Sequence, residues 1–467
     1  MEESVSGLGF THGDPIAPVI LGVTSILLFA VIGRFAARRI GQPTVLGELL
    51  MGIVLGNLAW YLGFDLITVL REGPRVFEVV SQTLAGVPIE QVATQIFGAD
   101  KGEEIVRIVT GPAGGEVMQV AQTVDVFSRY GVIFLLFMVG LEADLDEMRR
   151  VGGDSLRVAV IGVAAPFLLG FAAVALMRPD MPFNSDLFIA ATLGATSIGI
   201  TANVLREIGR SHSREGHIIL GAAVADDILG LIVLAVVSGI VVSGSIDMVE
   251  VILVVLVSAL FLIGAVIIGP GIVSMAAKIM GRLDIVEAKM FTSYLFVMIL
   301  AWVANIAGLA TIIGAFAAGI VLSDQFFRDY ELVNKRPVRI RELIMPLEVI
   351  LVPIFFILMG IQVKLESFFS WPVVMLGAAL LIAAILGKIA CGLGASKPVN
   401  KLAVGIGMMP RGEVGLVFAA IGRTLGVIDD AVFSAIVLMV MTTTLITPPL
   451  LKLVMGSSTE KSAAEDR

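Results

Sequence analysis

One apolar segment carries two consecutive aspartates at its centre: His217-Ile-Ile-Leu-Gly-Ala-Ala-Val-Ala-Asp226-Asp227-Ile-Leu-Gly-Leu-Ile-Val-Leu-Ala-Val-Val-Ser238. Its length matches the roughly 20 apolar residues that cross a bilayer as a helix. A charged side chain at the centre of such a helix costs roughly 2.5–3.5 kcal/mol on insertion scales. Two adjacent aspartates at that depth therefore indicate a functional site, and we interpret the rest of the chain as the structure that holds it.

The composition predicts an all-α polytopic membrane protein. Of the 467 residues, 57% are hydrophobic and 15% are charged, and the mean hydropathy is +0.98. The apolar runs are too long for strands, and a single cysteine excludes a disulfide-rich secreted protein. The acidic N-terminus lacks the basic region of a cleavable signal peptide. We expect membrane lipid around the chain, and neither a nucleic-acid partner nor a cofactor.

Hydropathy predicts thirteen transmembrane helices, each close to the length that crosses a bilayer. They lie near 15–35, 43–63, 128–144, 155–177, 186–206, 216–240, 248–272, 288–307, 309–324, 342–363, 372–394, 401–424 and 430–455. If the N-terminus is outside, most of the 32 lysines and arginines fall in inner loops and in the C-terminal tail. This bias is the one expected for a protein of the cell (inner) membrane with an odd number of spans and a cytoplasmic C-terminus.

Two segments lie outside these spans. Residues 64–127 mix apolar residues with charges and Pro/Gly breaks, which predicts an extended outer loop, with or without one or two amphipathic helices at the membrane surface. Residues 458–467 are expected to be a short cytoplasmic tail, too short for a regulatory nucleotide-binding domain. The transmembrane unit is expected to occupy residues 1–457.

A weak internal repeat relates two of the predicted spans. Met138-Val-Gly-Leu-Glu142-Ala-Asp-Leu145 in span three is similar to Leu358-Met-Gly-Ile-Gln362-Val-Lys-Leu365 in span ten. The two copies are seven spans apart, an odd number, so they face opposite ways across the membrane. Inverted repeats are typical of secondary transporters, with the binding site near the midplane between the copies.

Spans five and twelve are predicted to be discontinuous helices. Span five contains Gly194-Ala-Thr196-Ser197, and span twelve contains Pro410-Arg411-Gly-Glu413. Proline and several glycines interrupt a helix, and such backbone is tolerated at membrane depth only where it is buried in protein or lines a cavity. We therefore expect the two breaks to flank the site.

Lys388 lies about midway along span eleven, too far from either end to reach water easily. Pairing with a carboxylate lowers the cost of burying it, and Asp226 and Asp227 lie at similar depth. Neighbours on a helix point about 100° apart, so one aspartate can face Lys388 while the other faces a cavity. Carboxylates beside a lysine titrate as a coupled group. Such a site holds either protons or a cation, and with alternating access this competition gives antiport.

Several motifs in this chain resemble those of the type-two monovalent cation:proton antiporters, particularly the bacterial sodium/proton antiporters with two aspartates and a lysine. The motifs are Asp226-Asp227, Gly194-Ala-Thr196-Ser197-Ile-Gly-Ile-Thr201, Met409-Pro410-Arg411-Gly-Glu413-Val, Gly308-Leu-Ala-Thr-Ile-Ile-Gly-Ala-Phe-Ala-Ala-Gly319 and Gln42-Pro-Thr-Val-Leu-Gly-Glu48-Leu-Leu. The resemblance implies a homodimer in which a core domain moves like an elevator against a dimerisation domain. The core would be about 128–240 and 342–455, and the dimerisation domain about 15–63 and 248–324.

The resemblance also implies roles for the site residues. Asp227 would be the main ligand of a monovalent cation, and Asp226 would pair with Lys388 and share proton binding. Thr196 and Ser197 would line the crossing of the broken helices. Arg411 and Glu413 match the charged pair of the second broken helix, which is structural or gating in the family.

The leading hypothesis is electrogenic exchange of Na⁺ or Li⁺ for protons, and a K⁺/H⁺ antiporter of the same architecture is the alternative. An ion channel also stays open. An intramembrane aspartyl protease does not fit, because its two aspartates must face one another across a water from separate helices, whereas Asp226 and Asp227 are consecutive. The chain is therefore expected to be a transporter and not an enzyme.

Overall fold

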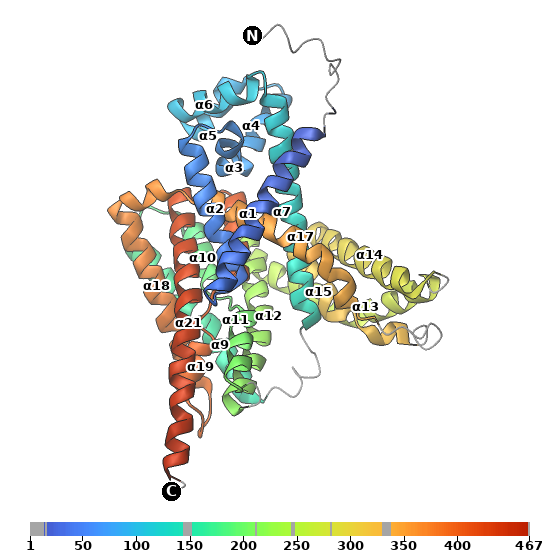
Figure 1. The fold of residues 1–467 in the computed structure, drawn as a ribbon, viewed down its shortest axis with the longest axis vertical. Coiled ribbons are helices and arrows are strands. Elements are labelled where there is room, and N and C mark those ends of the chain that lie inside the picture. Colours follow the sequence, from blue (N-terminus) through green and yellow to red (C-terminus); the bar gives the residue numbers. More distant parts are fainter. Residues whose placement is uncertain are drawn as a thin grey trace.

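The chain folds as a bundle of long helices (Figure 1). The computed structural model describes residues 14, 16–142, 152–210, 213–243, 248–280, 283–328 and 338–465. Within these ranges there is no β-strand, and ten helices are long and apolar enough to cross a membrane. They are α1 (Ala17–Arg39), α2 (Thr44–Tyr61), α7 (Gly114–Glu142), α9 (Gly153–Met177), α12 (Arg214–Ser243), α13 (Met248–Met280), α14 (Ile285–Ile306), α17 (Ile340–Ile361), α18 (Trp371–Cys391) and α21 (Asp430–Glu465).

The other three predicted spans are built from shorter helices. Span nine is α15 (Thr311–Val321), span five is the pair α10 (Phe183–Thr192) and α11 (Ile198–Glu207), and span twelve is the pair α19 (Lys401–Gly407) and α20 (Glu413–Thr424). Pro410 interrupts the second pair because it lacks a backbone N–H and disfavours helix at the residue before it. The all-α class, the thirteen spans and the two discontinuous helices are thus confirmed in the described part of the chain.

The helices pack as two groups. In the first, which we call the site bundle, α9, α10, α11, α12, α18, α19, α20 and α21 pack on one another. The second group, which we call the scaffold, consists of helices that likewise pack on one another: α1, α2, α7, α13, α14, α15 and α17. Figure 1 shows α13 and α14 extending to one side of the molecule and α18 lying on the other. Repeat counterparts are close neighbours: α7 packs on α17 and α9 on α18. The repeat motif beyond residue 142 lies outside the described residues.

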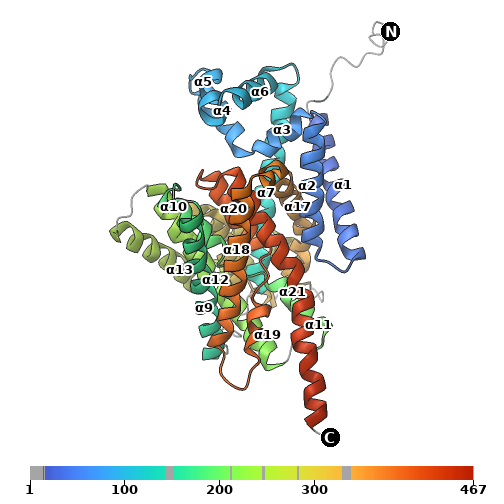
Figure 2. The ribbon, with the colours of Figure 1, turned by 90° about the vertical axis from the view of Figure 1, so that its left-hand side faces the viewer.

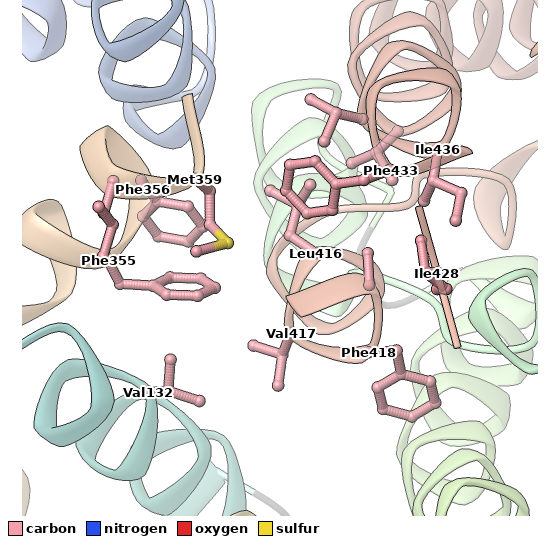
Figure 3. Packing of buried hydrophobic residues seen from close by; sticks show 14 of the residues in the cluster. Val132, Phe355, Phe356, Met359, Leu416, Val417, Phe418, Ile428, Phe433 and Ile436 are labelled. Carbon is pink, nitrogen blue, oxygen red and sulfur yellow. The ribbon is translucent and has the colours of Figure 1, made fainter. Parts of the chain in front are cut away.

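The predicted core domain included spans three and ten, now α7 and α17. These two helices pack chiefly on α15 and α2, so their packing groups them with the scaffold. Apolar side chains line the boundary between these two helices and the site bundle: Val132, Phe355, Phe356 and Met359 of α7 and α17 are drawn opposite Leu416, Val417 and Phe433 of α20 and α21 (Figure 3). The most extensive contact between the two groups is that of α12 with α13.

The segment predicted as an outer loop is helical. It forms α3 (Asp65–Glu72), α4 (Pro74–Leu84), α5 (Ile89–Phe97) and α6 (Ala99–Thr110), which we call the cap. The cap has a small core of its own, Val79, Val92 and Ala93. It lies beside the start of α1, and α21 ends at the opposite end of the molecule (Figures 1 and 2).

One predicted boundary needs correction. The third span begins at Gly114, so the start predicted near 128 is too late, because Glu116 and other polar residues lower the local hydropathy without ending the helix. The last span, Asp430–Met455, agrees with the predicted one, and the helix α21 continues beyond it to Glu465. Three short 3₁₀ helices complete the described structure: Asp324–Phe327, Leu365–Phe369 (η2) and Gly392–Gly394.

Candidate functional site

A fully buried ion pair lies at the centre of the site bundle. Lys388 Nζ on α18 donates to Asp226 Oδ1 on α12 at 2.9 Å, and both side chains have no exposed surface. The other carboxylate oxygen, Asp226 Oδ2, is also buried and accepts no hydrogen bond.

Asp227 lies on the next position of α12 and points to a different side of the helix. Its relative exposure is 6%, compared with 0% for Asp226. The two acids therefore have different surroundings. Asp226 is held by Lys388, and Asp227 is the more accessible of the two.

The two helix breaks lie against each other and are hydrogen-bonded. The Ser197 amide donates to the carbonyl of Pro410 at 2.9 Å. The hydroxyl of Thr196 donates to Met408 O at 3.3 Å, and that of Thr201 to Gly407 O at 2.6 Å. These bonds satisfy backbone carbonyls that the interrupted helices leave without partners. The residues at 193–197 and 408–412 thus form one crossing, as expected for discontinuous helices buried in protein.

Gly412 allows the breaks to come this close. A Cβ added at Gly412 would lie 2.6 Å from Ser197 Oγ, closer than real Cβ contacts. Any side chain at position 412 would therefore push the two breaks apart.

Arg411 is buried at the crossing. Its Nη1 donates to the carbonyl of Ala195, and its own carbonyl accepts from Thr444 Oγ1 at 2.8 Å. Its Nε and Nη2 are buried and make no hydrogen bond. Arg411 therefore fastens the second break to the first and places a positive charge there. The side chain of Glu413 lies outside the described residues, although its backbone begins α20.

Sequence reasoning missed two residues that shape the site. A Cβ added at Gly162 of α9 would lie 3.5 Å from both Asp226 Oδ1 and Lys388 Nζ, so this glycine forms one wall of the ion pair. No local signal identifies it, because glycines are frequent in the chain. Thr444 lies in the run Thr442-Thr443-Thr444, and this polar triplet within span thirteen was a signal that could have been used.

The oxygen-rich donor set suits a hard cation. The carboxylates of Asp226 and Asp227, and the hydroxyls and backbone carbonyls of the crossing, offer oxygen atoms, which hard cations prefer as ligands. Among the described residues, no group of three or more His, Cys, Asp or Glu side chains is placed to hold a metal ion.

The fold and the site define a polytopic membrane transporter with two discontinuous helices crossing beside a buried acid–lysine pair. The chain belongs to the sodium/hydrogen exchanger family, whose transmembrane region matches residues 24–455. The resemblance noted from the motifs is thereby confirmed. The family consists of antiporters and not of enzymes, which also removes the aspartyl protease alternative.

Relatives and a solved structure agree with this assignment. The chain is 36% identical to the high-affinity Na⁺/H⁺ antiporter NhaS3 of Synechocystis over 96% of this chain and 94% of that protein. It is 33% identical to the Na⁺/H⁺-K⁺ antiporter GerN of Bacillus cereus, over 76% of this chain and 89% of that protein. The sodium proton antiporter MjNhaP1 of Methanocaldococcus jannaschii has the same fold, with a TM-score of 0.58 at 17% identity, over 93% of this chain and 96% of that one.

Proposed function

We propose that this chain exchanges Na⁺ or Li⁺ for protons at the Asp226–Asp227 site. The observation that supports it most is the buried Lys388–Asp226 pair beside Asp227 at the crossing of two broken helices. NhaS3 and the relative from Enterococcus hirae, 29% identical, are both named Na⁺/H⁺ antiporters.

Competition at the acids couples the two ions. Asp227 is the main cation ligand, and a proton on Asp227 removes the charge that attracts the cation. Asp226 Oδ2, buried and without a donor, is available as a second ligand oxygen. When a cation engages Asp226, Lys388 loses part of the attraction that keeps it protonated and releases a second proton. Two protons exchanged for one monovalent cation make the exchange electrogenic.

Alternating access follows from sliding of the site bundle against the scaffold. The apolar interface of Figure 3 supports this motion, because apolar contacts are not directional and can be exchanged for one another as the bundle moves. We place the moving core in the site bundle alone, with α7 and α17 in the dimerisation domain. The chain acts as a homodimer in the cell membrane, with its N-terminus outside and its C-terminus in the cytoplasm.

Exchange in proteoliposomes tests this function. An outward proton gradient should drive Na⁺ uptake, and Asp227→Asn should abolish it because the neutral amide attracts neither ion. The matched control is Asp125→Asn, which removes an acid paired with Arg129 on α7, away from the site. Uptake that persists in Asp227→Asn would contradict the assignment.

A K⁺/H⁺ antiporter is the second candidate, and the name of the relative GerN favours it. No single described residue of the site determines which size of cation is preferred. A series of Li⁺, Na⁺, K⁺ and Rb⁺ in the same vesicles separates the two candidates, because only the transported ions collapse the proton gradient.

A further inference from the structure

A cluster of buried charges joins the cap to the site bundle. We call it the cap network and define it as Arg71 and Glu72 of α3, Lys364 between α17 and η2, Arg423 of α20 and Asp430 of α21. Arg71, Glu72, Lys364 and Arg423 are each at most 7% exposed, and the side chain of Asp430 is 19% exposed. The cation–proton site lies elsewhere in the bundle and uses none of these residues.

Lys364 is the centre of the network on the scaffold side. Its Nζ donates to Glu72 Oε1 at 2.6 Å and to Asp430 Oδ2 at 2.7 Å. It therefore connects the first cap helix with the first turn of α21. Arg75 of α4 makes a further link, with Nη1 at 3.3 Å from Asp430 Oδ2.

Arg423 is the centre on the bundle side. Its Nη1 donates to Gln362 Oε1 at the end of α17 at 2.7 Å, and its Nη2 donates to the carbonyl of Arg71 at 2.8 Å. The same Nη2 lies 2.8 Å from Asp430 Oδ1. One guanidinium thus contacts the scaffold, the cap and α21 together.

These contacts cross the boundary between the two groups of helices. Arg423 and Asp430 belong to the site bundle, whereas Gln362 and Lys364 follow the scaffold helix α17, and Arg71 and Glu72 belong to the cap. Displacement of α20 and α21 past α17 stretches the links across this boundary. The side chains drawn in Figure 3 are apolar and make no ion pairs.

Separating buried charges is unfavourable, because each is left without a partner in a poorly hydrated place. A small cavity beside the network, lined by Arg71, Glu72, Lys101, Glu104 and Glu366 among others, has room for water. Water entering there can hydrate the charges once they part, which lowers the barrier to release without removing the preference for the paired state.

We propose that the cap network is a latch that holds the site bundle in the position seen here and opens in each transport cycle. The proposal rests on the proposed function in one respect, namely that the bundle moves. It gives the cap a role in setting the balance between the two conformations. The latch does not depend on which cation is transported.

Distances between spin labels test the latch. One label at Leu84→Cys in the cap and another at Trp371→Cys at the start of α18 span the boundary, and both positions are exposed. The native Cys391 is buried, and unmodified protein checks that it takes no label. We expect one dominant distance in the parent. Asp430→Asn, which weakens the links to Lys364, Arg75 and Arg423, should shift the ratio of a second distance to the first by about tenfold.

Controls separate the latch from general disruption. Glu72→Gln removes one partner of Lys364 and should shift the distances in the same direction by less, and Arg129→Gln outside the network should not. A label pair within cap and scaffold, at Leu84 and Leu62, should keep its distance in every variant. A shift in that pair, or unchanged Leu84–Trp371 distances in both Asp430→Asn and Glu72→Gln, would overturn the latch. Absence of exchange in the parent with every cation would instead refute the proposed function, and the distances would still report on the latch.

Discussion

At the scale of single residues, the Lys388–Asp226 pair has the most defined energetics. Both side chains are completely buried, so each is stabilised mainly by the other. Removing one member of a buried ion pair leaves the other without compensation and costs about 3–5 kcal/mol. We therefore expect Lys388→Met to lower the thermal unfolding midpoint in detergent as well as to abolish electrogenic exchange.

The double variant Lys388→Met with Asp226→Asn provides the control. It removes both charges, so most of the lost stability should return while electrogenic exchange stays absent. If Lys388→Met alone unfolds at the same temperature as the parent, the pair does not stabilise the fold in the way described.

The proposed competition between ions at Asp227 predicts the sign of the pH dependence. As the pH falls, protons occupy Asp227 more often, and the apparent KM for Na⁺ should rise. For one competing proton the rise approaches about tenfold per pH unit under acidic conditions. Initial rates at several Na⁺ concentrations and pH values check this, and a KM that does not change with pH would argue against a shared site.

At the scale of helices, the contact of α9 with α18 depends on a glycine. A Cβ added at Gly387 would lie 2.6 Å from the backbone of Pro166, where neither atom can yield easily. Gly387→Ala should therefore force the two helices apart, at a cost of about 1–3 kcal/mol, and should disturb Lys388 at the next position.

Gly377 of the same helix is the matched control for Gly387. A Cβ there would lie 3.6 Å from the side chain of Ala435, an ordinary contact. Gly377→Ala should keep the unfolding temperature and exchange rate of the parent. Equal effects of both substitutions would mean that helix flexibility, and not the contact with Pro166, is what matters.

Hydropathy and helix-breaking residues determine much at this scale. The two interrupted spans were predictable because Pro410 and the glycines break helices wherever they occur. The start of α7 and the length of the cap were not predictable in this way. Polar residues such as Glu116 occur both in loops and on helices that extend beyond the membrane, so the local sequence does not distinguish the two.

At the scale of the whole molecule, the turn between α3 and α4 places the cap against Gln362, which is hydrogen-bonded to Arg423 of the cap network. Gly73 has φ of +65°, a conformation that residues with a side chain rarely adopt, and a Cβ there would lie 3.0 Å from Gln362 Nε2. Because Gln362 accepts from Arg423, we expect Gly73→Ala to loosen the cap network and to raise hydrogen exchange in α3.

A substitution at Gly63 distinguishes the effect of backbone strain from that of the contact with Gln362. It has φ of +78°, and a Cβ there would meet no atom within 4 Å. Gly63→Ala should therefore impose a similar local strain without affecting hydrogen exchange in α3. A comparable loosening by both substitutions would show that strain alone accounts for the effect of Gly73→Ala.

The sequence by itself determined the class of protein, the thirteen spans and the two interruptions, and it predicted the acids of the proposed site. These follow from the cost of burying charge in a bilayer and from the helix-breaking chemistry of proline and glycine, which act locally. Only the tertiary structure decided that α7 and α17 pack with the scaffold, that Gly162 forms a wall of the ion pair, and that Lys364 and Arg423 meet the cap. Such partners lie far apart in the chain, and a charge at the end of a helix has the same local sequence whether it faces water or another charge.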